Sequence, residues 1–200
     1  MPRDLAFDVD TWCEVCDSGD TGLRQRAASR LLDSDEALLE EPECRRQIAD
    51  AVLVAANDRL FAVLFWFALL GPLGAVAYRS VAVLYQQRPL RSGVEDGVAG
   101  LYSALIWLPA RLLALGYALS GHFDAAIEAW RQANREYLHG VDGSERLLAV
   151  TGAGALGPAE DRDSEGDVEL PARAAMRLVW RTLIIWLVMI SVLTLAGWAG

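Results

Sequence analysis

Arg111 is the residue whose type and position point most clearly to chemistry, because it places a guanidinium inside an otherwise apolar block, residues 98–119. It stands nine positions before Ser120, which is about 13 Å along a helix and too far for the side chain to reach water easily. A charge at that depth costs about 3 kcal/mol on insertion scales. Trp107 lies one turn earlier on the same face, and a cation–π contact with its ring is expected to offset about 0.5–2 kcal/mol.

Two roles remain open for Arg111. In the first, the guanidinium faces the helix bundle and bonds backbone carbonyls. Pro72 has no N–H to donate to the carbonyl of Ala68, so that oxygen is expected to be free at a similar depth. In the second role, Arg111 binds an anionic ligand. The structural role is the interpretation we favour, and Arg111→Leu, tested separately for folding and for activity, distinguishes the two.

The pair Cys13-x-x-Cys16 invites a zinc or redox interpretation. Zinc requires four ligands, and the distant Cys44, His122 and His139 do not complete a recognised ligand spacing. The histidines flank a predicted helix and are expected to be polar residues at its ends. We therefore expect ordinary thiols, no metal site and no cofactor.

The glycines Gly152, Gly154 and Gly157 match the pattern GxGxxG after the apolar Leu147–Val150. A dinucleotide site needs a helix that begins at the glycines, whereas here Gly157-Pro158 leads into an acidic stretch. The sequence contains no lysine, which excludes a Walker A loop. The glycines are therefore expected to form a flexible hinge, and no Ser/His/Asp combination has the spacing of a catalytic site.

Composition points to a membrane protein. Hydrophobic residues make up 54% of the chain, above the share of about 45–50% in soluble domains. They gather in the blocks Leu60–Tyr78, Val98–Leu119 and Leu178–Ala199, while the net charge of −9 comes mainly from Asp8–Glu43 and Glu160–Glu169. No basic patch is present, so nucleic acid is a poor candidate partner.

The block Leu60–Tyr78 contains no charge over nineteen residues. As a helix it would cover roughly 28 Å, close to the ~30 Å hydrocarbon core of a bilayer, and it is predicted to span the membrane. The apolar stripe before it continues without a breaker. One long helix is therefore expected from about Cys44 to Leu70, interrupted at Gly71-Pro72.

The predicted fold is all-α: a helical integral membrane protein with three transmembrane helices and a cytoplasmic helical portion. Residues 1–58 are expected to form a cytoplasmic helical segment, 59–120 a transmembrane hairpin, 121–176 a cytoplasmic amphipathic helix with an acidic loop, and 177–200 a C-terminal transmembrane helix. The amphipathic helix runs from Phe123 to Tyr137, and its mixed charges favour packing on other helices over lipid. Residues 140–172 are expected to be a mobile loop. Trp180 and Trp198 suit an aromatic girdle at each interface.

Arginines flanking the blocks predict the orientation, because positive charge accumulates on the cytoplasmic side. Three lie on the side of the 79–97 loop: Arg79, Arg88 and Arg91. Seven lie on the side of the N-terminus and the 121–177 segment: Arg45, Arg46, Arg59, Arg131, Arg135, Arg173 and Arg177. The N-terminus is therefore predicted to be cytoplasmic, which keeps the cysteines reduced.

Three stretches resemble one family, the AmpE branch of the CobD/CbiB-like inner-membrane proteins, over about residues 50–200. They are Asn57–Arg79, Trp107–Leu112 with Gly121–Arg131, and Trp180–Trp198. The resemblance implies a bacterial inner-membrane regulator of β-lactamase induction by cell-wall antibiotics. Its partners would be the lipid bilayer and, as one option, another inner-membrane or cell-wall-recycling protein. The alternative is a cobalamin-biosynthesis adenosylcobinamide-phosphate synthase or a degenerate relative of it, and a third option is an inactive fragment.

The family also implies which positions matter and where this chain departs from it. An acidic residue commonly precedes the W/Y-x-P-A-R segment, where this chain has Ile106. Relatives usually begin with further hydrophobic helices, and the synthases carry a His-Pro motif near their start, so this chain is expected to correspond to the C-terminal two-thirds of the family's length. Both departures favour a non-enzymatic signalling protein. The candidate functional or structural positions are Arg59, Trp66, Gly71, Pro72, Tyr78, Arg79, Trp107, Pro109 and Arg111.

Overall fold

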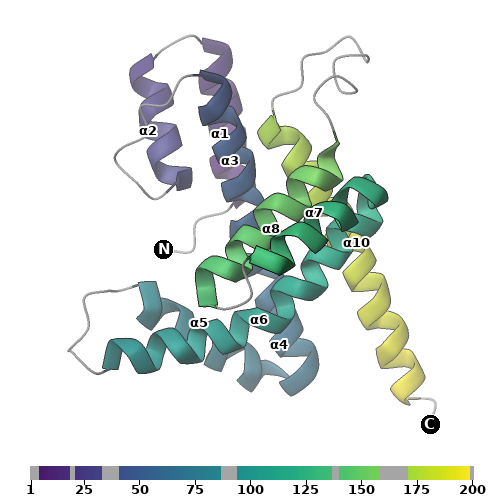
Figure 1. Ribbon diagram of the computed structural model, residues 1–200. Helices are drawn as coiled ribbons and strands as arrows, with labels where there is room; N and C mark the ends of the chain where they lie inside the picture. Colours follow the sequence, from purple (N-terminus) through teal and green to yellow (C-terminus); the bar gives the residue numbers. More distant parts are fainter. Residues whose placement is uncertain are drawn as a thin grey trace.

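The computed structural model describes residues 5–18, 21–32, 41–86, 94–136, 140–157 and 171–198, which are helical almost throughout and contain no strand. Figure 1 shows the helices in order along the chain. They are α1 (Leu5–Ser18), α2 (Thr21–Leu32), α3 (Glu41–Ala56), the π-helical turn η1 (Asn57–Phe61), α4 (Ala62–Leu70), α5 (Pro72–Gln86), α6 (Val94–Ser120), α7 (Phe123–Glu136), α8 (Gly140–Leu156) and α10 (Pro171–Trp198).

Three stretches are long and apolar enough to cross a membrane: Cys44–Leu70, Glu95–Ser120 and Pro171–Gly197. Each has 26 or 27 residues, and a helix of that length rises about 40 Å, more than the ~30 Å hydrocarbon core. Large apolar side chains lie exposed at the α4–α5 turn, along one face of α6 and over the second half of α10, as lipid contact requires. They include Leu70, Leu73, Leu112, Leu119, Val188 and Leu195. The predicted class, an all-α integral membrane protein with three spanning helices, is confirmed.

The first span differs from the prediction at its end. α3, η1 and α4 follow one another without a break from Glu41 to Leu70, as expected for one long helix. The helix then ends because Gly71 adopts φ +69°, and Pro72 opens α5 with a φ that suits a first helical position. The expectation that Leu60–Tyr78 forms one span is therefore wrong. α5 turns back against α4 so closely that a Cβ at Gly74 would collide with the backbone of Trp66.

The core lies where α3, η1, α6 and α10 meet. The Tyr117 hydroxyl on α6 donates to the Leu53 carbonyl on α3 at 2.8 Å, and the rings of Phe61 and Trp186 meet edge to face at 5.4 Å. Gly116 lies directly against the Thr182 and Trp186 side chains. Because Ser120 also contacts Thr182, α6 and α10 run antiparallel where they touch.

The expectation of a loop over residues 140–172 is wrong for its first part, because Gly140–Leu156 is the helix α8. α8 is buried through residues such as Leu147, Leu148 and Ala155 and lies beside α6 and α7 in Figure 1. The helix was not predicted because glycine is common in loops. Here the glycines lie inside a helix, where they permit close packing against its neighbours. Residues 158–170 lie outside the described ranges.

The predicted amphipathic helix is confirmed as α7. Ala126 and Ala133 are buried, while Asp124, Glu128 and Arg131 are exposed. α7 packs on α8, so its apolar stripe faces protein. The helical N-terminal segment is also present, as α1 and α2 packed beside α3 (Figure 1).

Candidate functional site

The carboxylate of Asp58 is the centre of the polar cluster that the fold builds. Asp58 belongs to η1, where one π-helical turn interrupts the α-helical register, and such turns occur frequently at functional sites. The preceding residue, Asn57, continues a buried stripe made by Ala49 and Leu53 and is only 2% exposed. Polar side chains therefore enter the interior at the point where the helix changes its register.

Three hydrogen-bond donors from three elements converge on this carboxylate. The Tyr102 hydroxyl on α6 donates to Asp58 Oδ2 at 2.7 Å, the short length typical of a charge-assisted hydrogen bond. The Tyr78 hydroxyl on α5 and the Asn57 amide donate to Oδ1 at longer distances, 3.5 and 3.4 Å. Asp58 thus ties η1 to both α5 and α6.

The tyrosines are held in place by their rings. Tyr102 stacks between Tyr85, at 4.3 Å between ring centroids, and Tyr78, at 6.4 Å. Tyr78 and Tyr102 are each 1% exposed, so both phenols must satisfy their hydroxyls inside the protein. The stack therefore fixes the two donors that Asp58 requires.

A second carboxyl approaches the cluster from α8. Burial, together with the negative charges of Asp58 and Asp142, raises the pKa of Glu145 to about 7. The positive charge of Arg79 acts on the Asp58 carboxyl group. A carboxyl with such a pKa exchanges its proton near neutral pH. The net charge of the cluster can consequently change near neutral pH, when Glu145 gains or loses its proton.

Asn57 adds to the cluster a hydrogen-bond acceptor that is not used. Its Oδ1 is buried without a hydrogen-bond partner in the described part of the chain. Across the same ranges, no three His, Cys, Asp or Glu side chains are placed to hold a metal ion together.

Two of the positions predicted from the sequence, Trp66 and Pro109, are related through one backbone carbonyl, that of Leu105. Pro109 lies inside α6 and has no N–H to donate to the Leu105 carbonyl, four residues earlier. The Trp66 indole N–H on α4 donates to that carbonyl at 3.1 Å. A side chain on a neighbouring helix thus satisfies the backbone group that the proline leaves open.

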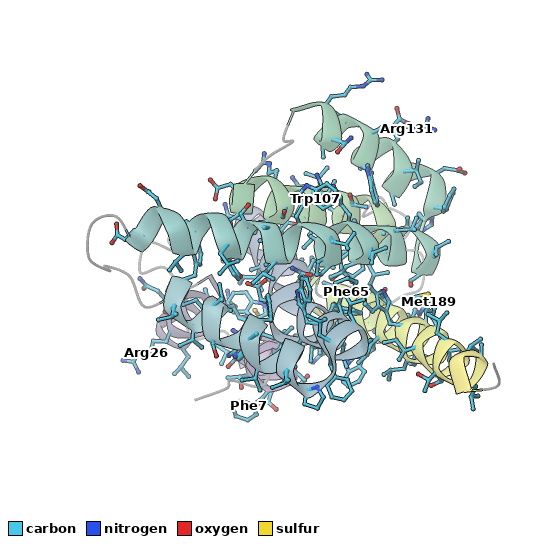
Figure 2. All side chains as sticks on the ribbon, turned by 90° about the horizontal axis from the view of Figure 1, so that it is seen from below. Phe7, Arg26, Phe65, Trp107, Arg131 and Met189 are labelled. Atoms are coloured by element: carbon cyan, nitrogen blue, oxygen red, sulfur yellow. The ribbon has the colours of Figure 1, made fainter. Side chains whose placement is uncertain are left out.

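Arg111 makes the expected contact with Trp107, but the carbonyl to which it donates is not the one that was expected. Its guanidinium stacks over the Trp107 ring at 4.0 Å, which confirms the cation–π contact, and it donates to the Trp107 carbonyl at 3.3 Å. Ala68 is not among the described hydrogen-bond partners of Arg111. Trp107, on α6 in Figure 2, is 45% exposed, whereas Tyr102 on the same helix is 1% exposed. The Arg111–Trp107 pair therefore lies on the outer face of α6 and not among the buried residues of the Asp58 cluster.

The remaining predicted positions lie close to the cluster in sequence or in space. The Arg59 guanidinium lies 3.4 Å from the Asp8 carboxylate on α1 and ties η1 to the N-terminal helices. Gly71 and Pro72 make the turn that brings α5 back, and α5 carries Tyr78 and Arg79.

The site also contains residues that the sequence analysis missed: Asn57, Asp58, Tyr102 and Glu145. One signal was available, since Asn57 is a polar residue on a stripe that recurs every fourth position through Ala49 and Leu53. Tyr102 and Glu145 come from distant elements, and no spacing in the sequence links them to Asp58.

The other motifs have structural explanations. Burial raises the pKa of the Cys16 thiol, which disfavours the reactive thiolate. Within the described part of the chain, Cys13, Cys16 and Cys44 form no disulfide. The hinge interpretation of the glycine motif is wrong. A Cβ at Gly152 would meet the Leu53 side chain on α3, and one at Gly154 would meet the Ala125 backbone on α7. Both glycines therefore allow a neighbouring helix to pack closely against α8. His139 and the Trp198 side chain lie outside what the structure describes.

Fold and cluster together define a helical integral membrane protein with a polar site inside its bundle. The chain matches the family model described as regulatory signalling modulator protein AmpE over residues 31–199. It therefore belongs to the AmpE family, whose members are bacterial inner-membrane proteins.

Similar curated proteins carry two names. A cobalamin biosynthesis protein CobD of Chromobacterium violaceum is 32% identical over 161 residues, covering 78% of this chain and 50% of the relative. A CobD of Stutzerimonas stutzeri is 30% identical over 193 residues, covering 87% and 62%. Protein AmpE of Shigella flexneri is 27% identical over 167 residues, covering 79% and 56%. The chain thus spans about half to three-fifths of the length of these relatives. No solved structure matches the chain at a significant level.

Proposed function

We propose that this chain is an inner-membrane regulator of the AmpE type, which modulates β-lactamase induction in response to cell-wall antibiotics by binding a ligand or partner. The family match over residues 31–199 is the observation that carries the proposal. The Asp58 cluster supports it, because hydrogen bonds and charge there link η1, α5, α6 and α8. A change of charge at the cluster would alter the packing of all four elements at once.

The test is a deletion of the gene in its own host, followed by measurement of β-lactamase activity before and after exposure to a cell-wall antibiotic. We expect the induction ratio to change on deletion and to return with the wild-type gene. Asp58→Asn should fail to restore it while the protein still accumulates in the membrane. The matched control is Glu128→Gln on the exposed face of α7, which should restore induction fully. Unchanged induction in the deletion strain would contradict the proposal.

A second candidate is a cobalamin-biosynthesis adenosylcobinamide-phosphate synthase, or a degenerate relative of it. It is favoured by relatives named cobalamin biosynthesis protein CobD, among them those at 32% and 30% identity. The same deletion strain discriminates between the candidates when its growth is made dependent on cobinamide. Lost growth with intact induction identifies the synthase, and the opposite result identifies the regulator.

We further propose the predicted orientation, with the N-terminus in the cytoplasm and the C-terminus outside. The arginine distribution supports it also when Arg59 and Arg79, which both lie near Asp58, are left out of the count, because six of the counted arginines then remain on the predicted cytoplasmic side and only Arg88 and Arg91 on the other. A phosphatase that is active only outside the cytoplasm, fused after residue 200, should be active, and a cytoplasmic reporter at the same position should be silent. The reverse pair of results would contradict this orientation.

A further inference from the structure

A basic pocket lies at the end of α6, and none of its lining residues belongs to the Asp58 cluster. It has a volume of about 320 Å³, and α8 and α10 complete its walls. Its lining residues are Ser120, Gly121, His122, Ala155, Leu156, Ala174, Arg177, Leu178 and Arg181.

The polar side chains of this lining attract an anion. Arg177 and Arg181 contribute two guanidinium groups and His122 contributes an imidazole, and among the residues that the structure describes no Asp or Glu belongs to the lining. α7 begins at Phe123, directly after His122, so its first backbone N–H groups and positive helix end are beside the pocket. Two guanidinium groups next to a helix N-terminus suit a phosphate better than a carboxylate, because phosphate offers more acceptor oxygens.

Direct contacts join the helices that form the pocket walls. The His122 backbone N–H donates to the Ala155 carbonyl at 2.8 Å, and a Cβ at Gly121 would collide with the Ala155 backbone. The Thr182 hydroxyl lies 2.9 Å from Ser120 Oγ and joins α10 to the end of α6. A ligand would therefore meet a pocket that already has its shape.

The position of the pocket along α10 indicates where a ligand would come from. Arg181 is the last charged residue of the chain, and an uncharged stretch follows from Thr182. Apolar side chains next to the pocket are exposed, with Leu119 at 59%, Trp180 at 51% and Ile184 at 59%. An exposed tryptophan beside the last arginine is typical of the level where lipid headgroups meet the hydrocarbon core.

We propose that this pocket binds the phosphate of an anionic phospholipid headgroup. Arg177 and Arg181 hold the phosphate oxygens, and the acyl chains lie along the exposed apolar faces of α6 and α10. Basic pockets between membrane helices are known to select such headgroups. The site is separate from the Asp58 cluster, so it stands whether or not the regulatory function holds.

The test uses the full chain, purified in mild detergent and stripped of native lipid. Phosphatidylglycerol, phosphatidylcholine and soluble glycerol phosphate are titrated separately, and the midpoint of thermal unfolding is recorded. We expect phosphatidylglycerol to raise the midpoint in a saturable way, while the other two do not. The double variant Arg177→Gln/Arg181→Gln should require about 30-fold more phosphatidylglycerol, since each arginine near an anionic lipid accounts for about a fivefold change.

Arg173→Gln is the matched control, because Arg173 is exposed on α10 one turn before Arg177 and is absent from the lining. It should titrate like the wild type. The unfolding midpoint of the double variant without lipid is measured first and serves as the reference for its own titration. The proposal is overturned if phosphatidylcholine works equally well, if the double variant titrates like Arg173→Gln, or if glycerol phosphate alone produces the full shift.

Discussion

At the residue scale, the stability of the bundle depends on how the charge of Asp58 is satisfied. Its carboxylate is partly buried and accepts a short hydrogen bond from Tyr102 and a long one from Tyr78. Asn57 could have been suspected from the sequence because it interrupts an apolar stripe. Tyr78 was a candidate position from the family resemblance, but its contact with Asp58 and the part played by Tyr102 could not be foreseen. They depend on the turn at Gly71 and on the pairing of α5 with α6.

The two tyrosines should therefore differ when their hydroxyls are removed. Tyr102→Phe is expected to lower the free energy of unfolding by about 1.5–3 kcal/mol, the range for a hydrogen bond to a charged group. Tyr78→Phe should cost clearly less, because its distance to Asp58 Oδ1 is 3.5 Å and the bond is correspondingly weak. Thermal unfolding in detergent micelles measures both variants. Equal losses would show that the distances do not report the strength of these two bonds.

Glu145 predicts a dependence of stability on pH. Its pKa in the folded protein is about 7, above the ordinary value of 4.5, so the folded state binds the proton more tightly than the unfolded state does. The resulting stabilisation is fully present below about pH 4.5 and is lost as the pH rises through 7. The unfolding midpoint should therefore fall between pH 5 and pH 8.

Glu145→Gln should flatten that decline, since the amide does not titrate in this range. Asp142→Asn removes one of the negative charges that raise the pKa, so it should move the decline to lower pH. Glu128→Gln, on the exposed face of α7, should leave it unchanged. A decline of the same size in Glu145→Gln as in the wild type would exclude this residue as its source.

At the scale of the elements, the prolines and glycines explain both the successes and the failures of sequence-based prediction. The interruption at Gly71-Pro72 was predictable from residue type, but the direction of the next helix was not, because it depends on the contact between Gly74 and Trp66. Pro109 was predicted to matter, yet its partner, Trp66, lies 43 residues away. α8 was missed for the opposite reason, since glycines that serve packing look like those of a loop.

Gly71 and Gly97 should respond to alanine with opposite signs. Gly71 has φ +69°, where a Cβ is strained, so Gly71→Ala should destabilise by about 1–2 kcal/mol. Gly97 lies inside α6 with open space around it, so Gly97→Ala should stabilise by up to about 1 kcal/mol through helix propensity. Thermal unfolding of the two variants against the wild type provides the comparison, and a destabilised Gly97→Ala would contradict it.

Trp66 and Pro109 should be energetically coupled. Trp66→Phe removes the indole donor from the Leu105 carbonyl, and a buried unsatisfied carbonyl costs about 1–3 kcal/mol. In a Pro109→Ala background the alanine N–H can bond the same carbonyl within α6, so Trp66→Phe should cost less there. A double-mutant cycle isolates this difference from the change in ring volume, because the volume change is common to both backgrounds. Identical losses in both backgrounds would mean that the indole N–H is not needed at Leu105.

At the scale of the whole molecule, the membrane organises the fold. Three apolar blocks were sufficient to predict a helical membrane protein, because lipid requires helices whose backbone groups are satisfied internally. The end of the first span was predictable from residue type, because Gly71-Pro72 interrupts the helix that begins near Cys44. Hydropathy alone extended the span to Tyr78, since α5 is also apolar but packs against its neighbours. Figure 2 shows Met189 on the part of α10 that extends beyond the other helices, where the exposed side chains are almost all apolar.

That part of α10 provides the most direct test of a lipid environment. Val188 is 59% exposed near the middle of the uncharged stretch that begins at Thr182, so Val188→Arg would place a guanidinium in the hydrocarbon core. On insertion scales this costs about 2.5–3.5 kcal/mol, and we expect a clear loss of protein from alkali-washed membranes. Gln132→Arg adds the same charge on the exposed face of α7 and should be harmless. In water both substitutions would be surface changes of little consequence, so only lipid around α10 makes the two variants differ.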